Sequence, residues 1–321
     1  MKGPVEAAAP SGPGPVGGVG SVVDPPRPAV VEVVTRALAE DLLPLGDLTS
    51  VLVPGSVQAS VLIVSREHGV LAGRACALET FHQVDPELRS EWSVADGDAL
   101  APGDLVATVS GPLRSILTAE RTALNFLCHL SGVATLTRSL VEAVAAVDPA
   151  ARVIDTRKTT PGLRALEKAA VRAGGARNHR GSLSEAVLVK DNHLGGVTIT
   201  EAVARARALW PGRMVEVECD RPDQVAEAVA AGATVVMLDN MTPDQAAACV
   251  ARVRRDGPGV LVEVSGGIDL ASAPRYAAAG VDLLSVGALT HSAPILDLGL
   301  DLAWGADGAP GSAPPDTQGK G

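Results

Sequence analysis

From about residue 150 onward, short runs of apolar, mostly β-branched residues alternate with alanine-rich stretches. The apolar runs lie at residues 152–155, 186–190, 214–218, 235–239, 261–265 and 282–287. Uninterrupted runs of this length are typical of parallel strands that are buried on both faces. The stretches between them, such as residues 222–231 and 243–254, have the spacing of amphipathic helices. The alternation therefore predicts a repeated βα unit.

The pattern before residue 112 is mixed. Residues 28–42 have helical spacing, and Pro28 suits a first helical turn. Residues 56–65 alternate apolar and polar positions like a strand, and turn signals further on bracket short strands. We therefore expect a small α+β domain here. Residues 118–146 predict two helices, with a break at Ser131-Gly132.

Composition limits the class of protein. Apolar residues make up 46% of the 321 residues and aromatic residues only 2%, so we expect a sizeable core of Val, Leu, Ile and Ala. Residues 1–27 and 305–321 are rich in Gly, Pro, Ala and Ser and lack periodicity, which predicts disordered tails. No apolar run reaches the roughly 20 residues that span a bilayer, and no segment has the pattern of a signal peptide. We expect no membrane association.

Charge and cysteine content narrow the class further. The sequence pI of about 5.1, with no basic stripe carrying aromatic residues, argues against nucleic-acid binding. The four cysteines are far apart and form no CxxC pair, so we expect no disulfide framework and a cytoplasmic location.

One segment departs from the acidic character of the chain, whose formal net charge is −10. Residues 155–193 hold three of the five lysines, and five arginines lie among them. A protein that is acidic overall and basic in one place is expected to bind an anion there.

Polar residues follow the predicted strands, at the position where an α/β barrel carries its active site. Four of the basic residues form the predicted anion clamp, because arginine matches a carboxylate and lysine suits a phosphate. These residues are Arg157, Lys158, Arg180 and Lys190. Arg164, Lys168 and Arg172 instead lie in a helical stretch and suit a solvated helix face. His179 lies beside Arg180 and could hydrogen-bond a bound carboxylate or be a structural histidine.

Glu218 and Asp239 end consecutive predicted strands. Adjacent carboxylates at a barrel rim suit Mg²⁺, held through its waters together with a substrate phosphate. The alternative is that they pair with nearby arginines. Glu216 lies two residues before Glu218, on the same strand face, and could share or replace its role. Cys219 points to the other side of the strand and is expected in the core.

Two glycine-containing segments follow the last two predicted strands, where barrels often bind phosphate. They are Ser265-Gly266-Gly267 and Val286-Gly287-Ala288. Glycine lets backbone N–H groups approach a phosphate closely. An ordinary βα turn is the alternative for each segment.

Several long motifs in a fixed order identify a family. They are GDLTS at residues 46–50, ERTALNFLCHLSGVATLT at 120–137, DTRKTTPGLRALEKAAVRAGG at 155–175, NHR at 178–180, KDNH at 190–193, EVE at 216–218, LDN at 238–240 and VSGGI at 264–268. From about residue 30 to 303 the chain resembles the quinolinate phosphoribosyltransferases, or carboxylating nicotinate-nucleotide pyrophosphorylases, of the type II phosphoribosyltransferase family. The pattern departs at Ala169-Ala170, where an aromatic residue is expected, and at Cys219, where an aliphatic residue is usual.

The resemblance implies an α/β fold with an incomplete α/β barrel behind an N-terminal α+β open-sandwich domain. It places the sandwich domain at residues 28–135, completed by about 290–304, and the barrel at 136–289. It further implies a homodimer with shared active sites, and it leaves a higher oligomer open. Arg121 would then enter the neighbouring subunit's site.

The resemblance also implies a reaction and roles. Quinolinate and 5-phosphoribosyl 1-pyrophosphate would give nicotinate mononucleotide, pyrophosphate and CO₂, a step of NAD biosynthesis. Quinolinate would be bound by Arg121, Arg157, His179, Arg180 and Lys190. The phosphoribosyl pyrophosphate would contact Lys158, Thr159, Ser265, Gly266, Gly267, Val286, Gly287 and Ala288, with Mg²⁺ at Glu218 and Asp239. Catalysis would depend on Lys158, Lys190, Glu218 and Asp239.

Three other functions remain open from the sequence. A molybdenum-locus homologue of this family would keep the barrel but alter the clamp, and the intact RKT and NHR segments favour quinolinate. A Schiff-base aldolase would use Lys190, at a strand end, as its amine. A non-catalytic sensor of phosphoribosyl pyrophosphate would have less need of Lys158, Glu218 and Asp239 together.

Overall fold

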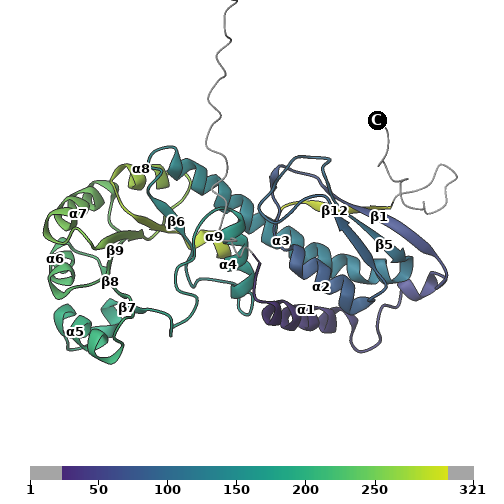
Figure 1. Ribbon diagram of the computed structural model, residues 1–321, viewed down its shortest axis with the longest axis horizontal. Helices are drawn as coiled ribbons and strands as arrows, with labels where there is room; N and C mark the ends of the chain where they lie inside the picture. The colour runs from purple at the N-terminus through teal and green to yellow at the C-terminus, as the bar shows by residue number, and fades with distance from the viewer. Residues whose placement is uncertain (1–23, 303–321) are drawn as a thin grey trace, which may run out of the picture.

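The computed structural model describes residues 24–302. Of the tails expected at residues 1–27 and 305–321, only residues 24–27 are described, and Arg27 already begins the first helix. Figure 1 shows two parts side by side, an antiparallel sheet covered by helices and a curved parallel sheet with helices on its outer side. This arrangement confirms the predicted α/β class, with an incomplete barrel behind an α+β open sandwich.

The first part is built on a four-stranded antiparallel sheet with the strand order β12-β1-β5-β3. Its strands are β1 (Gln58–Ser65), β3 (Arg89–Trp92), β5 (Leu105–Pro112) and β12 (Leu298–Leu302). Helices α1 (Arg27–Leu42) and α2 (Arg74–Val84) pack with α3 (Leu113–Ala145), which contacts the sheet. Two short strands, β2 (Gly69–Val70) and β4 (Ala99–Leu100), pair separately, and η1 (Ser50–Leu52) is a 3₁₀ turn. Because β12 pairs with β1, the last described residues return to the sheet that the first half of the chain builds.

Helix α3 is a single helix of 33 residues, so the predicted break at Ser131-Gly132 is wrong. A Cβ atom added at Gly132 would lie 2.0 Å from the Pro294 carbonyl oxygen. Gly132 therefore allows the segment before β12 to pass close to the backbone of α3. The helix tolerates this glycine because a glycine in a helix interior costs only about 1 kcal/mol. Ser131 is also part of this packing, because its hydroxyl donates to the Ala72 carbonyl at 3.1 Å.

The second part is a six-stranded parallel sheet with the order β6-β11-β10-β9-β8-β7. The strands are β6 (Arg152–Ile154), β7 (Val187–Val189), β8 (Val215–Cys219), β9 (Val235–Asp239), β10 (Leu261–Ser265) and β11 (Leu283–Ser285). Strands β6 and β7 form the two edges, so the described barrel is open between them. All six strands fall within the apolar runs of the sequence, to within one residue.

Helices separate the barrel strands. Helices α5 (Ile199–Leu209), α6 (Pro222–Ala231), α7 (Pro243–Asp256) and α8 (Ala273–Ala278) lie around the outside of the sheet (Figure 1). Helices α4 (Arg164–Ala173) and α9 (Ala288–His291) lie between the barrel and the first part. A 3₁₀ turn, η2 (Asp191–His193), follows β7. No helix within residues 24–302 is both long and apolar enough to cross a membrane.

The core is aliphatic, as the composition predicts, and Cys219 lies in it fully buried. It also contains ionisable side chains that are exposed by 6% or less. They are Asp155, Glu167, Lys168, Glu216 and Glu263. Charged residues are almost never fully buried unless they are paired, so these five mark places where the interior is built around a polar contact.

Candidate active site

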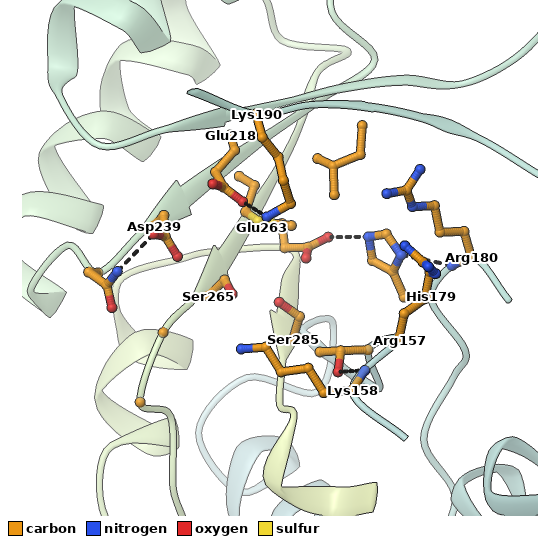
Figure 2. A pocket seen from close by; sticks show the side chains of 16 residues that line it. Arg157, Lys158, His179, Arg180, Lys190, Glu218, Asp239, Glu263, Ser265 and Ser285 are labelled. Atoms are coloured by element: carbon orange, nitrogen blue, oxygen red, sulfur yellow. Dashed lines mark hydrogen bonds and ion pairs between the residues drawn. The ribbon is translucent and has the colours of Figure 1, made fainter. Parts of the chain in front are cut away.

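A cavity of about 590 Å³ opens at the carboxyl ends of the barrel strands. Figure 2 shows side chains from the whole strand series converging on it. The lining residues are Thr156, Arg157, Lys158, His179, Arg180, Leu188, Lys190, Glu218, Met237, Asp239, Asn240, Glu263, Ser265, Gly266, Gly267 and Ser285. The cavity therefore brings together residues that are more than a hundred positions apart in the chain.

All four residues of the predicted anion clamp line this cavity. Arg157 and Lys158 follow β6, Lys190 follows β7, and Arg180 lies in the segment between them. Arg180 donates to the Ala186 carbonyl at 2.9 Å, and the buried Nε of Arg157 has no hydrogen-bond partner among the described residues. Burial first, and then the Arg157 charge, lower the pKa of Arg180. Two guanidinium groups held together, neither of them in an ion pair with a described residue, favour an anionic ligand.

A buried ion pair holds the clamp segment in place. The Asp155 carboxylate at the end of β6 pairs with the Lys168 ammonium of α4 and accepts from Asn178 Nδ2 at 2.7 Å. It also accepts from the His179 backbone N–H at 2.8 Å. Burial raises the pKa of Asp155 and lowers the pKa of Lys168, so each depends on the other for its charge.

This pair overturns the expectation of a solvated basic face on α4. Lys168 is only 6% exposed, because α4 packs against α3 and α9. Arg164 turns toward the site and donates to the Thr159 hydroxyl at 3.1 Å and to the Gly181 carbonyl at 3.2 Å. Arg172 donates to Asn178 Oδ1 at 2.6 Å. The basic residues of the helix therefore support the clamp segment from behind.

Glu218 and Asp239 lie on neighbouring strands at the same rim of the barrel. The Glu218 carboxylate pairs with the Lys190 ammonium, not with an arginine, and Asp239 accepts from Asn240 Nδ2 at 2.7 Å. Both carboxylates face the cavity, and oxygen ligands with room for water suit Mg²⁺. The predicted metal ligands therefore fit that ion.

The Ser265-Gly266-Gly267 loop lines the cavity, and its glycines are structurally required. Gly266 has φ +100° and Gly267 has φ +59°, in the left-handed region that favours glycine. A Cβ at Gly266 would lie 2.2 Å from Asn240 Oδ1. A side chain at Gly266 would displace Asn240, the residue that follows Asp239 at the end of β9.

The second glycine segment lies behind the cavity wall. Val286 is buried, and a Cβ at Gly287 would lie 3.1 Å from Lys158 Cδ. Gly287 therefore leaves room for the lysine side chain. None of Val286, Gly287 and Ala288 is among the residues that line the cavity. Thr159 does not line it either, and its hydroxyl accepts a hydrogen bond from Arg164.

Arg121 is not in this cavity. Its side chain on α3 is 66% exposed and lies 3.9 Å from the neighbouring Glu120 carboxylate. It lines a separate hollow of about 260 Å³ with Asp41, Asn125 and His129. Arg121, which was predicted to bind quinolinate together with the clamp residues, therefore lies outside the cavity of its own chain.

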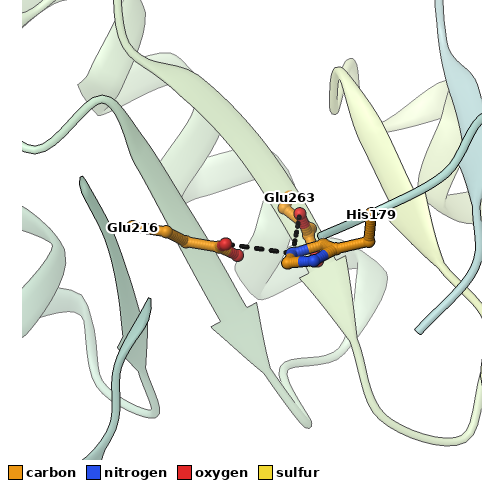
Figure 3. A group of neighbouring side chains, drawn as sticks. All are labelled: His179, Glu216 and Glu263. Carbon is orange, nitrogen blue, oxygen red and sulfur yellow. Dashed lines mark hydrogen bonds and ion pairs between the residues drawn. The ribbon is translucent and has the colours of Figure 1, made fainter. Parts of the chain in front are cut away.

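His179, Glu216 and Glu263 form a buried polar cluster (Figure 3), and two of them, His179 and Glu263, line the cavity. His179 Nδ1 accepts the Arg180 backbone N–H at 2.8 Å, so the ring proton is on Nε2. Nε2 lies 3.0 Å from Glu216 Oε2 and 3.7 Å from Glu263 Oε2. Because both ring nitrogens have partners, the predicted contact between His179 and quinolinate requires one partner to be exchanged.

Within residues 24–302, these three side chains also form a group whose ligand atoms all lie within 4.8 Å of one another. The spacing alone would allow a metal ion. The hydrogen bond between His179 and Glu216 satisfies the imidazole without one, and Mg²⁺ keeps several waters that a dry site would exclude. We therefore treat the cluster as a hydrogen-bonded group.

Sequence reasoning did not identify Glu263 and placed Glu216 with Glu218. The signal was present, because each glutamate interrupts an apolar run in a strand buried on both faces. An acidic residue at such a position needs a buried partner. Its presence in β8 and in β10, on either side of β9, indicates a polar group inside the barrel beside the cavity.

Comparisons with known proteins give the family. Residues 47–131 match the family model for the N-terminal domain of quinolinate phosphoribosyl transferase, and residues 133–301 match the model for its C-terminal domain. The chain is 44% identical over 278 residues to the nicotinate-nucleotide pyrophosphorylase [carboxylating] of Mycobacterium leprae, covering 85% of this chain and 97% of that protein.

Relatives from other organisms indicate the same family. The Rattus norvegicus enzyme of the same name is 39% identical over 254 residues, covering 78% of this chain and 84% of that protein. The solved nicotinate-nucleotide pyrophosphorylase of Francisella tularensis superposes with a TM-score of 0.82 at 38% identity, covering 87% of this chain and 98% of that one. With both domain models matched in order and similarity along nearly the whole length of these relatives, the chain belongs to the quinolinate phosphoribosyltransferase family.

Proposed function

We propose that this protein transfers the phosphoribosyl group of 5-phosphoribosyl 1-pyrophosphate to quinolinate, with loss of CO₂, to give nicotinate mononucleotide. The observation that carries the proposal is the clamp. Arg157, Arg180 and Lys158 face one cavity, and none of them forms an ion pair with a described residue. Quinolinate is a dianion and its co-substrate carries several negative charges, so a site for both needs unpaired cations.

The two substrates would occupy opposite ends of the cavity. Arg157, Arg180 and His179 lie at one end, where two arginine forks suit the two carboxylates of quinolinate. Ser265 and its glycine loop lie toward the other end, with Lys158 below and Asp239 beside the loop. Backbone N–H groups of that loop and the Lys158 ammonium suit phosphate groups. Lys190 lies between the ends and serves both substrates.

Charge and positioning supply the catalysis. The pyridine nitrogen is held against the ribose carbon while pyrophosphate leaves, and fixed positive groups stabilise the charge that develops on the leaving group. Glu218 and Asp239 would hold Mg²⁺ through its waters, and the ion would neutralise part of the pyrophosphate charge. Lys190 is released from Glu218 as the anions arrive. In the structure the Glu218 carboxylate holds this amine in an ion pair, which disfavours Schiff-base chemistry there.

We propose that the active site is completed in a homodimer, by the partner subunit's Arg121. The segment at residues 43–52 exposes Leu43, Leu45, Leu48 and Leu52 by 65–79%. It lies along the start of α3, since the Thr118 hydroxyl donates to Asp47 Oδ2 at 2.9 Å. An exposed apolar surface beside an exposed arginine suits a subunit contact that carries the arginine into a neighbouring cavity.

The direct test is a turnover assay. Purified protein mixed with quinolinate, phosphoribosyl pyrophosphate and Mg²⁺ should form nicotinate mononucleotide, pyrophosphate and CO₂ in equal amounts. Chromatography measures the nicotinate mononucleotide. Nicotinate in place of quinolinate is the matched control, because it lacks the 2-carboxylate that the second arginine would bind. Equal use of nicotinate, or no product from quinolinate, would exclude this function.

A further inference from the structure

Glu263 is a buried acid in the middle of the cavity that the proposed reaction has not yet used. It is 1% exposed and lines the cavity, and its Oε1 has no hydrogen-bond partner among the described residues. It lies two residues before Ser265 on β10, so both side chains point to the same face of the strand. Figure 2 shows it between His179 at one end and the Glu218–Lys190 pair at the other. It therefore lies where the two substrates would meet.

The surroundings indicate that Glu263 holds a proton. His179 directs its Nε2 hydrogen to Glu216 at 3.0 Å, whereas Glu263 lies at 3.7 Å. Glu216 is therefore the carboxylate that the imidazole stabilises, and a negative charge on Glu263 would lie beside the Glu216 charge with only the longer His179 contact and the Ser285 hydroxyl to offset it. Burial first, and then the Glu216 charge, raise the pKa of Glu263. The charged and titratable groups around Glu263 are Glu216 on β8 and, along the cavity, His179, Arg180, Arg157, Lys158, Lys190, Glu218 and Asp239.

The proposed reaction requires a proton at one carbon. After the ring nitrogen is joined to ribose, the bond between C2 and its carboxylate carbon breaks and CO₂ leaves. The electron pair stays on C2 beside the cationic nitrogen. A proton must then reach C2 to give nicotinate mononucleotide. C2 is adjacent to the nitrogen that bonds to ribose, so it faces the junction of the two substrates.

We propose that Glu263 is the general acid that donates this proton to C2, an inference that rests on the proposed function. The Glu263 O–H bond breaks, a C2–H bond forms, and Glu263 becomes a carboxylate. The negative charge that entered on the substrate 2-carboxylate ends on Glu263, so the charge inside the cavity is unchanged across the step. Glu263 regains a proton from water after the product leaves. A lysine donor would instead remove a positive charge that the phosphates need.

The test separates the two chemical steps in a single turnover. Quinolinate carrying ¹⁴C in its 2-carboxyl group is mixed with excess Glu263→Gln protein, phosphoribosyl pyrophosphate and Mg²⁺. Pyrophosphate release should stay within about tenfold of the wild-type rate, while nicotinate mononucleotide formation falls by roughly 10²–10⁴-fold, the usual effect of a general acid. Quinolinate mononucleotide, with both carboxylates, should accumulate.

Two further variants serve as controls. Glu263→Asp keeps a carboxyl group and should recover part of the lost rate. It also keeps the test usable if the Gln variant does not fold. Glu216→Gln keeps the proposed acid and the burial that is the first cause of its raised pKa, but removes the Glu216 charge, so it should uncouple the two steps less than Glu263→Gln does.

The outcomes distinguish this inference from the proposed function. If wild-type protein releases no pyrophosphate with quinolinate, the function is wrong and this inference falls with it. If wild-type protein turns over and Glu263→Gln forms nicotinate mononucleotide as fast as it releases pyrophosphate, the function stands and Glu263 is not the acid. Equal loss of coupling in Glu263→Gln and Glu216→Gln would also overturn the assignment, since both would then act through the packing of the cluster.

Discussion

The buried ionisable residues behind the cavity have polar partners that offset the cost of burying a charge. Asp155 is matched by Lys168 and by the His179 backbone. Glu167 accepts the Thr160 backbone N–H at 3.0 Å and contacts His129 Nε2 at 2.9 Å, which fixes the turn after Lys158. These contacts orient the clamp residues without touching a ligand. The precision of the site therefore depends on residues outside it.

The protonation of Glu263 predicts a pH dependence of stability. Its pKa is raised on folding, so the protonated form favours the native state. That contribution is fully present below the unfolded pKa of about 4.3 and is lost as the pH rises through the folded pKa. The glutamine of Glu263→Gln does not ionise, so the variant does not lose this stability. The difference in free energy of unfolding between the variant and wild type should therefore increase by up to about 1.4 kcal/mol per pH unit between the unfolded and the folded pKa of Glu263.

Urea unfolding of both proteins at pH 5, 6 and 7 measures this difference. Glu87→Gln, at an exposed glutamate, is the control and should follow the wild-type curve at every pH. Parallel curves for Glu263→Gln and wild type would mean that Glu263 is ionised in the resting protein. That result would also remove the proton source for C2.

At the residue scale, the sequence predicted the cavity residues that stand at strand ends. Each of these residues ends an apolar run; they are Lys190, Glu218, Asp239 and Ser265. The carboxyl ends of the strands in an α/β barrel all lie at one rim, so the predicted barrel already brings these residues together. The sequence did not predict which cations are buried. Lys168 has the helical spacing of a surface residue, and only the packing of α4 against α3 and α9 places its ammonium beside Asp155.

At the scale of elements, α3 connects the two parts of the molecule. Its first half lies on the antiparallel sheet, and it also contacts β6 and α4 beside the clamp. The sequence predicted a break because glycine weakens a helix. A long-range contact with the segment before β12 explains the glycine instead, and no local pattern reports such a contact.

Gly132→Ala should therefore destabilise the protein although alanine is the better helix former. The added Cβ would lie 2.0 Å from the Pro294 carbonyl oxygen and 2.9 Å from Ile295 Cα, and backbone atoms on both sides leave little room to move. We expect a loss of about 1–3 kcal/mol in the free energy of unfolding, the usual range for overpacking. Denaturant unfolding measures it.

Gly195→Ala is the matched control for this substitution. A Cβ at Gly195 would meet nothing within 4 Å, so its stability should be unchanged or rise by about 0.5 kcal/mol. If Gly132→Ala is as stable as this control, the close passage between α3 and the segment before β12 is not formed in solution.

At the scale of the whole molecule, the fold follows from the sequence more readily than the complete site does. The βα rhythm determines the barrel because each strand and helix is a local pattern. Arg121 differs, because nothing in its helix distinguishes it from a surface arginine. Its 66% exposed side chain acquires a role only if a second copy presents a cavity to it. Residues that act between subunits leave no periodic signal in one chain.

Mixed dimers test that arrangement directly. Arg121→Ala and Lys190→Ala chains should each be inactive as homodimers, because every site lacks one required cation. In a mixed dimer, one cavity combines an intact Lys190 with the partner subunit's Arg121, and the other cavity has neither. Random 1:1 mixing makes about half the dimers mixed, so about one quarter of the wild-type activity should return.

Differently tagged chains let the mixed dimers be isolated and counted before the assay. Purified mixed dimers should then reach about half of the wild-type activity, because one site in each is complete. Mixed dimers that form and stay inactive would show that each cavity uses its own chain's Arg121. Since Arg121 lines a separate hollow in the single chain, that result would require α3 to move relative to the barrel.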